Sequence, residues 1–436
     1  MSVDYIVEKR NTKIYGKGEA PPMEYPKLRY GLEAVPFEHE NQEMILLRDR
    51  MGFCDTPLVI SKPLLLLLTR MDGQHSLRDL QELFLRATGE ILYTEKLKEI
   101  VDALDKASFL DSQRFEELAR VAIAGFLEDP IRRMHLNGRS YPEEPAQLRR
   151  QLNGFFAQEL GGPGAIGPSS ATPPNSLVGI VAPHIDLQAG GPCFAHAYKT
   201  IAESRAPDTW VILGTGHEPI VNLFSLTAKD FETPLGTVAC DRTFAEALTH
   251  GMRRDLHASE FNHAREHSIE FQAIFLACYQ PHARIVPVLC AFSHEEWLEE
   301  QAFIDETAEL LRQLAAEPGR SVGFMASVDL AHVGPRYGDP FEPDMGTVTE
   351  HLAADRLLIE DLERCDAVGF MHRIERERNR RKVCGVGPLY MLAKILEGRA
   401  SGKMLHHSYA TVDSQRSFVS FASMAYFDHS TARPEH

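Results

Sequence analysis

The feature that most constrains the fold of this chain is a series of short apolar runs that alternate with helical segments in its second half. The runs "SLVGIVAP", "TWVILGT", "ARIVPVLC" and "SVGFMASVD" are rich in β-branched residues, and stretches such as "HSIEFQAIFLACYQ" lie between them. Strands that are apolar on both sides belong to a sheet covered on both faces, and their alternation with helices predicts βαβ units. The late runs "LHHSYATVD" and "SFVSFASMAYF" add strands, and residues 222–241 are interpreted as a hairpin-like insertion. The sequence therefore predicts an α/β/α sandwich with a mostly parallel or mixed sheet.

Chemically reactive side chains follow three of these runs. In open α/β sheets ligands bind at the carboxyl ends of the strands, so these side chains are expected at one edge. They come in pairs: His184 with Asp186, His217 with Glu218, and Asp329 with His332. Neutral imidazoles are common metal ligands, and a neighbouring carboxylate can fix their tautomer. A histidine after a strand can equally be a hydrogen-bonded loop residue, so both interpretations stay open. Gly190 and Gly191 are interpreted as the turn into the next helix.

A second polar cluster occurs in "NHAREHSIEFQ". His267 and Glu270 are neighbours at i, i+3 on a helix that Ser268 could cap. The alternative is a solvated, charged turn. The pattern HExxH is absent from the sequence, so a zincin protease has no support.

One cysteine stands out among the seven. Cys384 precedes a Gly-x-Gly-Pro turn and an apolar helix, and Arg380, Arg381 and Lys382 come just before it. A helix N-terminus and basic neighbours lower the pKa of a thiol, so this position predicts a thiolate that serves as a metal ligand or a nucleophile. For the other cysteines we expect small apolar core residues. A GxSxG elbow and a Walker sequence are both absent.

Composition restricts the class of protein further. With 436 residues the chain is expected to form two domains, and its net charge of −16 argues against nucleic-acid and anionic-membrane partners. The cysteines are scattered without a CxxC pair, which favours a reducing cytoplasm over a disulfide framework. The run "PLLLLLTRM" is too short to span a bilayer, which needs roughly 20 apolar residues. We therefore expect a soluble, cytoplasmic protein.

The N-terminal part of the chain has a different pattern. Residues 1–34 are polar and rich in proline, which predicts an extended arm, and residues 35–130 are mostly of helical pattern. Ser76 with Asp79 forms a candidate capping box for a helix that ends at Gly89. These helices predict a small, mainly helical module of winged-helix type.

One segment of this module resembles a known family of domains. The next helix has Thr94 as its candidate cap, and the segment "MDGQHSLRDLQELF" resembles PqqD-like peptide-recognition domains over roughly 70 residues.

The motifs of the second half together resemble one family. "VAPHIDLQAGGPCFAHAYK", "VILGTGHEP", "EHSIEFQ", "SVDLAHVG" and "VCGVGP" occur in the order and spacing of the MEMO family, whose bacterial members are called AmmeMemoRadiSam system protein B. The segment "HLNGRSYPEEPAQLRRQLNGFF" resembles the opening of the family domain. The resemblance implies a MEMO-like α/β domain over residues 131–436, with the glycine- and proline-rich stretch 161–176 as a loop inside it. It also implies a fold similar to that of LigB-type class III extradiol dioxygenases.

The resemblance implies a metal site as well. The dioxygenases hold non-haem iron with two histidines and a carboxylate, and the MEMO site has two histidines and a cysteine. Carried over by motif, the metal ligands are His184, His217 and Cys384. Catalytic or proton-transfer roles are expected for Asp329, His332 and His267, and Asp186, Glu218 and Glu270 are expected as further pocket residues. Iron(II) is the first choice of metal, with copper and zinc as alternatives.

The sequence departs from the family pattern at two positions. Animal members have a second histidine where this chain has Glu218, and a histidine where it has Gly387, so neither position supplies an imidazole acid or base here.

Three functions follow as hypotheses. The first is a metal-dependent redox or oxygenase-like enzyme that acts on an unknown small molecule or peptide. The second is a peptide- or protein-binding module that partners AMMECR1-like and radical-SAM proteins. The third is a metal-dependent hydrolase.

Overall fold

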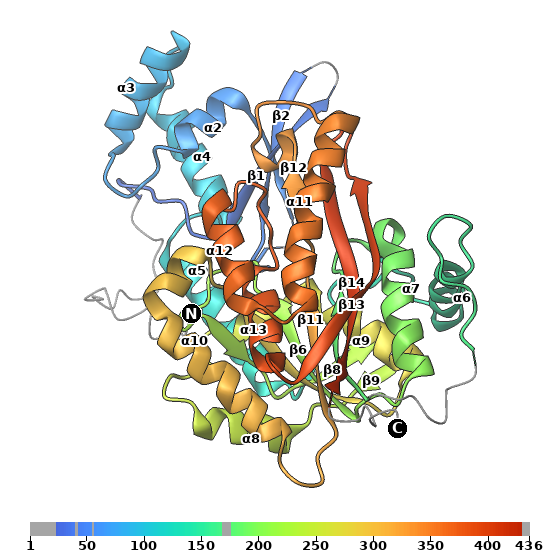
Figure 1. Ribbon diagram of the computed structural model, residues 1–436. Coiled ribbons are helices and arrows are strands. Elements are labelled where there is room, and N and C mark those ends of the chain that lie inside the picture. The colour runs from blue at the N-terminus through green and yellow to red at the C-terminus, as the bar shows by residue number, and fades with distance from the viewer. Residues whose placement is uncertain (1–22, 40–41, 55, 168–175, 430–436) are drawn as a thin grey trace, which may run out of the picture. The chain divides into compact units, whose positions relative to one another are not determined.

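The computed structural model describes residues 23–39, 42–54, 56–167 and 176–429 of the chain. The chain divides into two compact units, residues 1–128 and residues 129–436 (Figure 1). Residues 1–22 of the predicted arm and residues 168–175 of the predicted loop lie outside the described residues.

The N-terminal unit contains a sheet that the sequence patterns did not reveal. Three antiparallel strands pair in the order β1-β2-β3: β1 (Leu32–His39), β2 (Gln42–Asp49) and β3 (Leu58–Ser61). Four helices follow: α2 (Lys62–Leu68), α3 (Leu77–Thr88), α4 (Thr94–Lys106) and α5 (Gln113–Glu128). The winged-helix-type arrangement stays a prediction.

The helix caps of this unit largely follow the sequence. Both bonds of the predicted capping box join Ser76 and Asp79 at the start of α3, and Gly89 ends the helix in the left-handed conformation with φ of 75°. Helix α4 begins one residue earlier than predicted, because Tyr93 is its N-cap and Thr94 is already helical.

The larger unit is built on one mixed sheet. Strands β5, β11, β6 and β10 are parallel, while β14 and β7 pair with them antiparallel, and the order is β12-β14-β5-β11-β6-β10-β7 with β13 also on β14. The parallel strands are β5 (Leu177–Ala182), β6 (Thr209–Thr215), β10 (Arg284–Cys290) and β11 (Val322–Ser327). The others are β7 (Phe224–Leu226), β12 (His332–Val333), β13 (Ala400–Thr411) and β14 (Phe418–Asp428). The predicted insertion includes β8 (Asp230–Thr233) and β9 (Gly236–Val238), which pair with each other and, through β8, with β4 (Ile131–Arg132).

Helices cover both faces of this sheet, as the apolar strands predicted (Figure 1). One apolar cluster joins the sheet to α6 (Pro145–Phe156), α7 (Leu187–Glu203) and α9 (His267–Tyr279). The opposite cluster joins it to α8 (Arg242–Gly251), α10 (His294–Ala315), α11 (Met345–Glu363), α12 (Ala367–Glu377) and α13 (Val386–Leu396). Short 3₁₀ helices lie at Glu260–Ala264 and Pro335–Tyr337. The observed α/β/α layering confirms the predicted fold class of this unit.

The glycine pair after the first parallel strand has another role than the predicted turn. Helix α7 begins at Leu187 with Asp186 as its N-cap, so Gly190 and Gly191 lie inside the helix. A Cβ on Gly191 would overlap the ring of Phe155. Gly191 therefore allows α6 and α7 to pack closely, while a Cβ on Gly190 would overlap Ile185.

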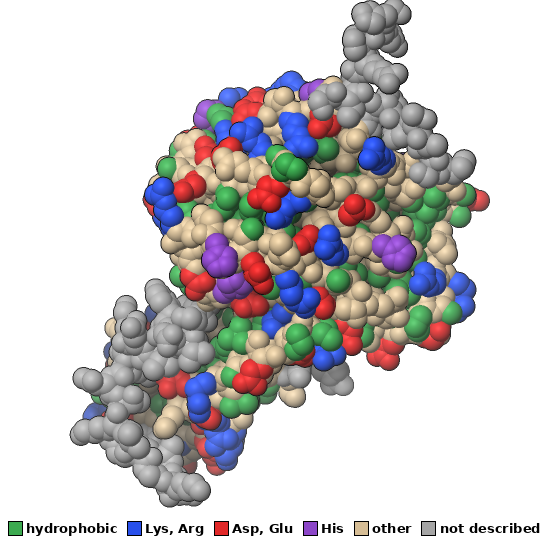
Figure 2. Space-filling model, turned by 90° about the horizontal axis from the view of Figure 1, so that it is seen from below, with side chains coloured by type: hydrophobic (Ala, Val, Ile, Leu, Met, Phe, Trp, Pro, Cys, Tyr) green, Lys and Arg blue, Asp and Glu red, His purple; other side chains and the backbone are tan. Residues whose placement is uncertain are grey.

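In the part of the chain that the structure describes, no helix is long and apolar enough to cross a bilayer. On the face drawn in Figure 2, acidic and basic side chains are interspersed. Mixed charge of this kind is typical of a solvated surface.

Candidate metal centre

The strand order brings the predicted ligands to one edge of the sheet. Strands β5, β11 and β6 are neighbours, and His184, Asp329 and His217 follow their carboxyl ends. Cys384 comes from the segment just before α13. One ligand atom each of His184, His217 and Cys384 lies within 4.8 Å of the other two, and Sγ of Cys384 is 3.4 Å from Nε2 of His184. Ligands about 2.0–2.3 Å from one metal ion are spaced in this way.

The His184 imidazole is buried and held in one tautomer. Its Nδ1 lies 3.0 Å from the carbonyl oxygen of Ser327, which can only accept, so Nδ1 carries the proton and the lone pair is on Nε2. Burial lowers the pKa of His184 to about 3, which keeps the ring neutral. The side chain is therefore prepared as a nitrogen donor toward Cys384.

His217 is oriented by a buried carboxylate. Both carboxylate oxygens of Glu266 lie 3.0 Å from Nδ1 of His217, and Glu266 also accepts the backbone N–H of His217 at 3.1 Å. Burial alone would lower the pKa of His217, but the charge of Glu266 and the hydrogen bond with Cys384 raise it well above its ordinary value. A cation shared with Cys384 would take the place of this proton.

His267 shares the same carboxylate. Its Nδ1 lies 3.3 Å from a Glu266 oxygen, and its ring stacks on that of His217 with centroids 4.7 Å apart. The pKa of His267 falls to about 4, chiefly through burial. The predicted cap of α9 differs from the observed one, because Glu266 caps the backbone N–H of Ser268.

The surroundings of Cys384 differ from those predicted. Burial raises the pKa of its thiol, against the lowering effect of the His217 hydrogen bond. Two of the three basic residues before it form ion pairs elsewhere, because Arg381 pairs with Asp355 and Glu377, and Lys382 pairs with Asp339. The predicted lowering of the thiol pKa is therefore wrong for this protein without a bound cation. A cation is what would favour the thiolate here.

Asp329 lies beneath the centre and supports its backbone. One of its oxygens accepts the N–H groups of His184 at 3.1 Å and Ile185 at 3.2 Å, and the other lies 3.6 Å from Nε2 of His184. Burial raises the pKa of this carboxyl. The main role of Asp329 in this geometry is to hold the backbone of His184 and Ile185.

His332 lies at the border of the same region. Its Nδ1 lies 3.1 Å from the carbonyl oxygen of Lys382, two residues before Cys384, and its ring meets that of Tyr337 edge to face at 5.0 Å. Burial lowers the pKa of His332 to about 4, so the ring is neutral at physiological pH.

The remaining predicted pocket residues take other positions. Glu270 is buried in an ion pair with Arg132, which ties α9 to β4, and it also accepts the N–H of Leu136. Asp186 is exposed and caps α7 through the N–H of Gln188. Glu218 is half-buried next to His217. Of the three, Glu218 is the one that adjoins a predicted ligand in the chain.

Two supporting residues were not among the predicted site residues. Glu266 orients the half-buried imidazoles of His217 and His267, and Gln272 on α9 donates hydrogen bonds to Pro183 and Ser327. Glu266 directly precedes the helix and Gln272 lies inside it. Their polar character was the signal that the sequence offered, since their partners are distant in the sequence.

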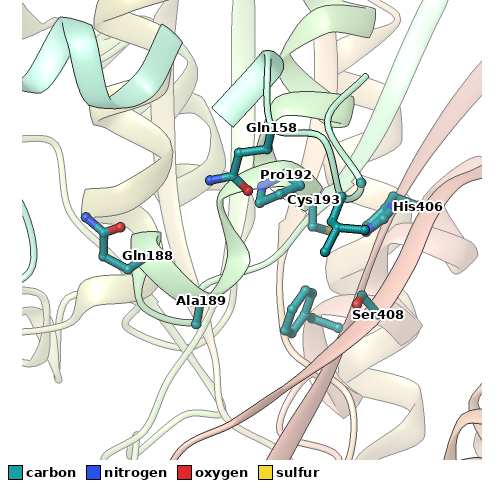
Figure 3. Close-up of a pocket in the computed structure, with 10 residues that line it drawn as sticks. Gln158, Gln188, Ala189, Pro192, Cys193, His406 and Ser408 are labelled. Atoms are coloured by element: carbon teal, nitrogen blue, oxygen red, sulfur yellow. The ribbon is translucent and has the colours of Figure 1, made fainter. Parts of the chain in front are cut away.

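A separate cavity of about 360 Å³ lies between α7, the segment that follows α6 and strands β13 and β14 (Figure 3). Its wall includes Gln158, Gln188, His406 and Ser408, and none of its described lining residues belongs to the candidate metal groups. Two further wall residues, Cys193 and Phe421, pack in the same small apolar cluster as Ile185. The cavity is thus distinct from the candidate metal centre.

Comparison with known proteins agrees with the motifs. The family model described as Memo-like protein matches residues 132–425. A MEMO1 family protein of Aquifex aeolicus is 27% identical over 404 residues, which cover 92% of this chain and 100% of that protein. MEMO1 family proteins of Methanopyrus kandleri and Methanothermobacter thermautotrophicus are 35% and 30% identical, cover 63% and 62% of this chain, and are matched over 89% of their own length.

Proposed function

This chain belongs to the Memo-like (MEMO1) family, and on that premise we propose that its larger unit is a metal-dependent redox enzyme of oxygenase type. His184, His217 and Cys384 would hold one transition-metal ion at the carboxyl edge of the sheet. The substrate would be a small molecule or a peptide group that reaches this edge.

One observation carries the proposal: the three ligand atoms converge while each imidazole has its other nitrogen engaged. Nδ1 of His184 is held by the Ser327 carbonyl, and Nδ1 of His217 is held by Glu266. Metal-bound histidines commonly have such an acceptor on their second nitrogen, which fixes the ring and increases its basicity. A histidine that only stabilised a loop would not need its remaining nitrogen directed at a thiol.

The donor set suits a transition metal. Two imidazoles and a thiolate favour iron, copper or zinc over magnesium or calcium, which prefer oxygen ligands. We propose iron(II) first, because three protein ligands leave coordination positions open and the family resemblance implies a fold similar to that of iron-dependent dioxygenases. A bound iron(II) would supply one-electron redox chemistry and activation of a coordinated substrate.

The neighbouring residues would bind and orient the substrate and handle its protons. His267, neutral and stacked on His217, would accept a proton at Nε2 while Glu266 holds its Nδ1. His332 and Tyr337 would border the position of the substrate, since their paired rings lie beside the segment that carries Cys384. Asp329 would keep the His184 backbone in place.

Metal analysis of the purified full-length protein tests this proposal. The protein is prepared without oxygen, and its iron, copper and zinc are measured by mass spectrometry. We expect close to one transition-metal ion per chain, and a loss of about 10-fold or more in His184→Ala and Cys384→Ser, because each removes one of three protein ligands.

Two control variants make the test specific. His196→Ala and Cys278→Ser remove the same functional groups at half-buried positions outside the candidate group, and we expect both to retain the metal. A metal-free wild type after supply of iron(II), copper and zinc, or equal metal content in all four variants, would contradict the proposal.

A further inference from the structure

Helix α9 carries a polar network that reaches two of the candidate ligands from behind. Ser268 Oγ donates to the carbonyl of Thr215 at 3.0 Å, two residues before His217. Four residues further along the helix, the side chain of Gln272 is fully buried between the ends of β5 and β11. A buried amide in an apolar helix is costly unless all its hydrogen bonds are made.

All the strong hydrogen-bonding groups of the Gln272 amide are engaged. Its Nε2 donates to the carbonyl of Pro183 at 2.8 Å and to Oγ of Ser327 at 2.7 Å. Its Oε1 accepts the hydroxyl of Tyr198 at 2.8 Å. Two donors and one acceptor are thus matched to two acceptors and one donor, which fixes the orientation of the amide.

Both acceptors of Gln272 lead to His184. Pro183 directly precedes His184, so the hydrogen bond to its carbonyl holds the peptide group that joins the two residues. Ser327 is the residue whose own carbonyl accepts Nδ1 of His184 at 3.0 Å. Gln272 therefore fixes the main chain before this imidazole and the residue that orients its ring.

We propose that Gln272 is a positioning residue of the metal centre: it holds the main chain before His184 and the Ser327 residue whose carbonyl sets the His184 tautomer, and it is not itself a ligand. This inference rests on the proposed metal-binding function, because a positioning role has meaning only if His184 is a ligand. It goes beyond that function because it gives a side chain of α9, a helix that otherwise packs in the core, a role in holding a ligand in place.

The same helix offers a matched control at its other end. Gln280 caps α9, donates from Nε2 to the carbonyl of Pro207 at 2.6 Å, and accepts from Nε1 of Trp210 at 2.8 Å. It makes the same types of bond as Gln272, but at the amino end of β6. Loss of either amide should lower thermal stability, whereas only Gln272 should affect the metal.

Titration with Co²⁺ alone, followed by absorbance under anaerobic conditions, tests the inference on full-length protein. Co²⁺ bound to Cys384 gives a thiolate charge-transfer band and ligand-field bands that report coordination geometry. We expect Gln272→Met, which keeps the side-chain volume, to raise the Co²⁺ dissociation constant by about 10- to 100-fold and to alter the ligand-field bands. Gln280→Met should bind Co²⁺ like the wild type.

A milder variant covers the case in which Gln272→Met does not fold. Ser327→Ala removes one acceptor of Gln272 but keeps the carbonyl that holds His184, so we expect a smaller rise, about three- to tenfold. If the wild type shows the thiolate band and the folded Gln272 or Ser327 variants match it, the positioning role is wrong and the metal centre stands. If the wild type shows no such band, the metal centre itself is overturned, and this inference with it.

Discussion

The carboxylate of Glu270 stabilises the fold, although the sequence predicted it as a residue of the pocket. This carboxylate is buried and pairs with Arg132, whose side chain is fully buried. The guanidinium also donates to the carbonyls of His263 at 3.0 Å and Glu266 at 2.9 Å. Arg132 thus connects β4 to the segment that carries Glu266, and the pair anchors the start of the larger unit beside the centre.

This ion pair predicts a specific dependence of stability on pH. Burial would raise the pKa of Glu270, but the charge of Arg132 and the hydrogen bonds from Tyr141, Leu136 and Arg132 together lower the pKa below the ordinary value of 4.5. A lowered folded-state pKa means that the stabilisation is fully present above the unfolded-state pKa and is lost as pH falls through the folded-state pKa. Urea unfolding from pH 3 to 7 should therefore show a stability difference between wild type and Glu270→Gln that is largest above pH 4.5 and shrinks below it. A difference that is constant with pH would show that the carboxylate charge contributes nothing.

Secondary-structure elements follow the sequence where local patterns decide them. The parallel strands were predictable because runs such as "SLVGIVAP" are apolar on both faces, and the strand ends then located His184, His217 and Asp329. The supporting contacts were not predictable, because Gln272 and Pro183 are 89 residues apart and His217 and Glu266 are 49 apart. Strands β1 to β3 were missed because they lack the continuous apolar pattern of the large sheet.

Gly191 in α7 makes a prediction about helix packing. Alanine normally stabilises a helix interior relative to glycine by about 0.5–1 kcal/mol. At Gly191 a Cβ would overlap the buried ring of Phe155, so we expect Gly191→Ala to destabilise the protein by about 1–3 kcal/mol. Gly154 in α6 is exposed and has no atom within 4 Å of such a Cβ, so Gly154→Ala should be neutral or stabilising. Urea unfolding of the two variants decides the point, and equal effects would contradict the packing role.

At the scale of the whole molecule, the candidate ligands and the apolar core of the larger unit all lie within residues 129–436. The apolar clusters on both faces of the large sheet contain only residues of this unit, and the cluster around Leu80 and Leu104 contains only residues of the first. The Memo-like match also lies entirely within the larger unit, whereas the similarity to the Aquifex aeolicus protein covers 92% of the chain and so extends into the first. Each unit thus has a core of its own.

Separate cores predict that the larger unit folds and binds metal without the first. A fragment of residues 129–436 keeps every candidate ligand and both clusters around the sheet, because none of these residues comes from the first unit. We expect its Co²⁺ dissociation constant to lie within about threefold of that of the full-length protein, because only changes at or directly behind the ligands cost 10-fold or more. The same absorbance titration measures both proteins, and circular dichroism checks that the fragment is folded. A folded fragment that binds Co²⁺ much more weakly would show that residues 1–128 contribute to the centre, and an unfolded fragment would show that the two cores are not independent.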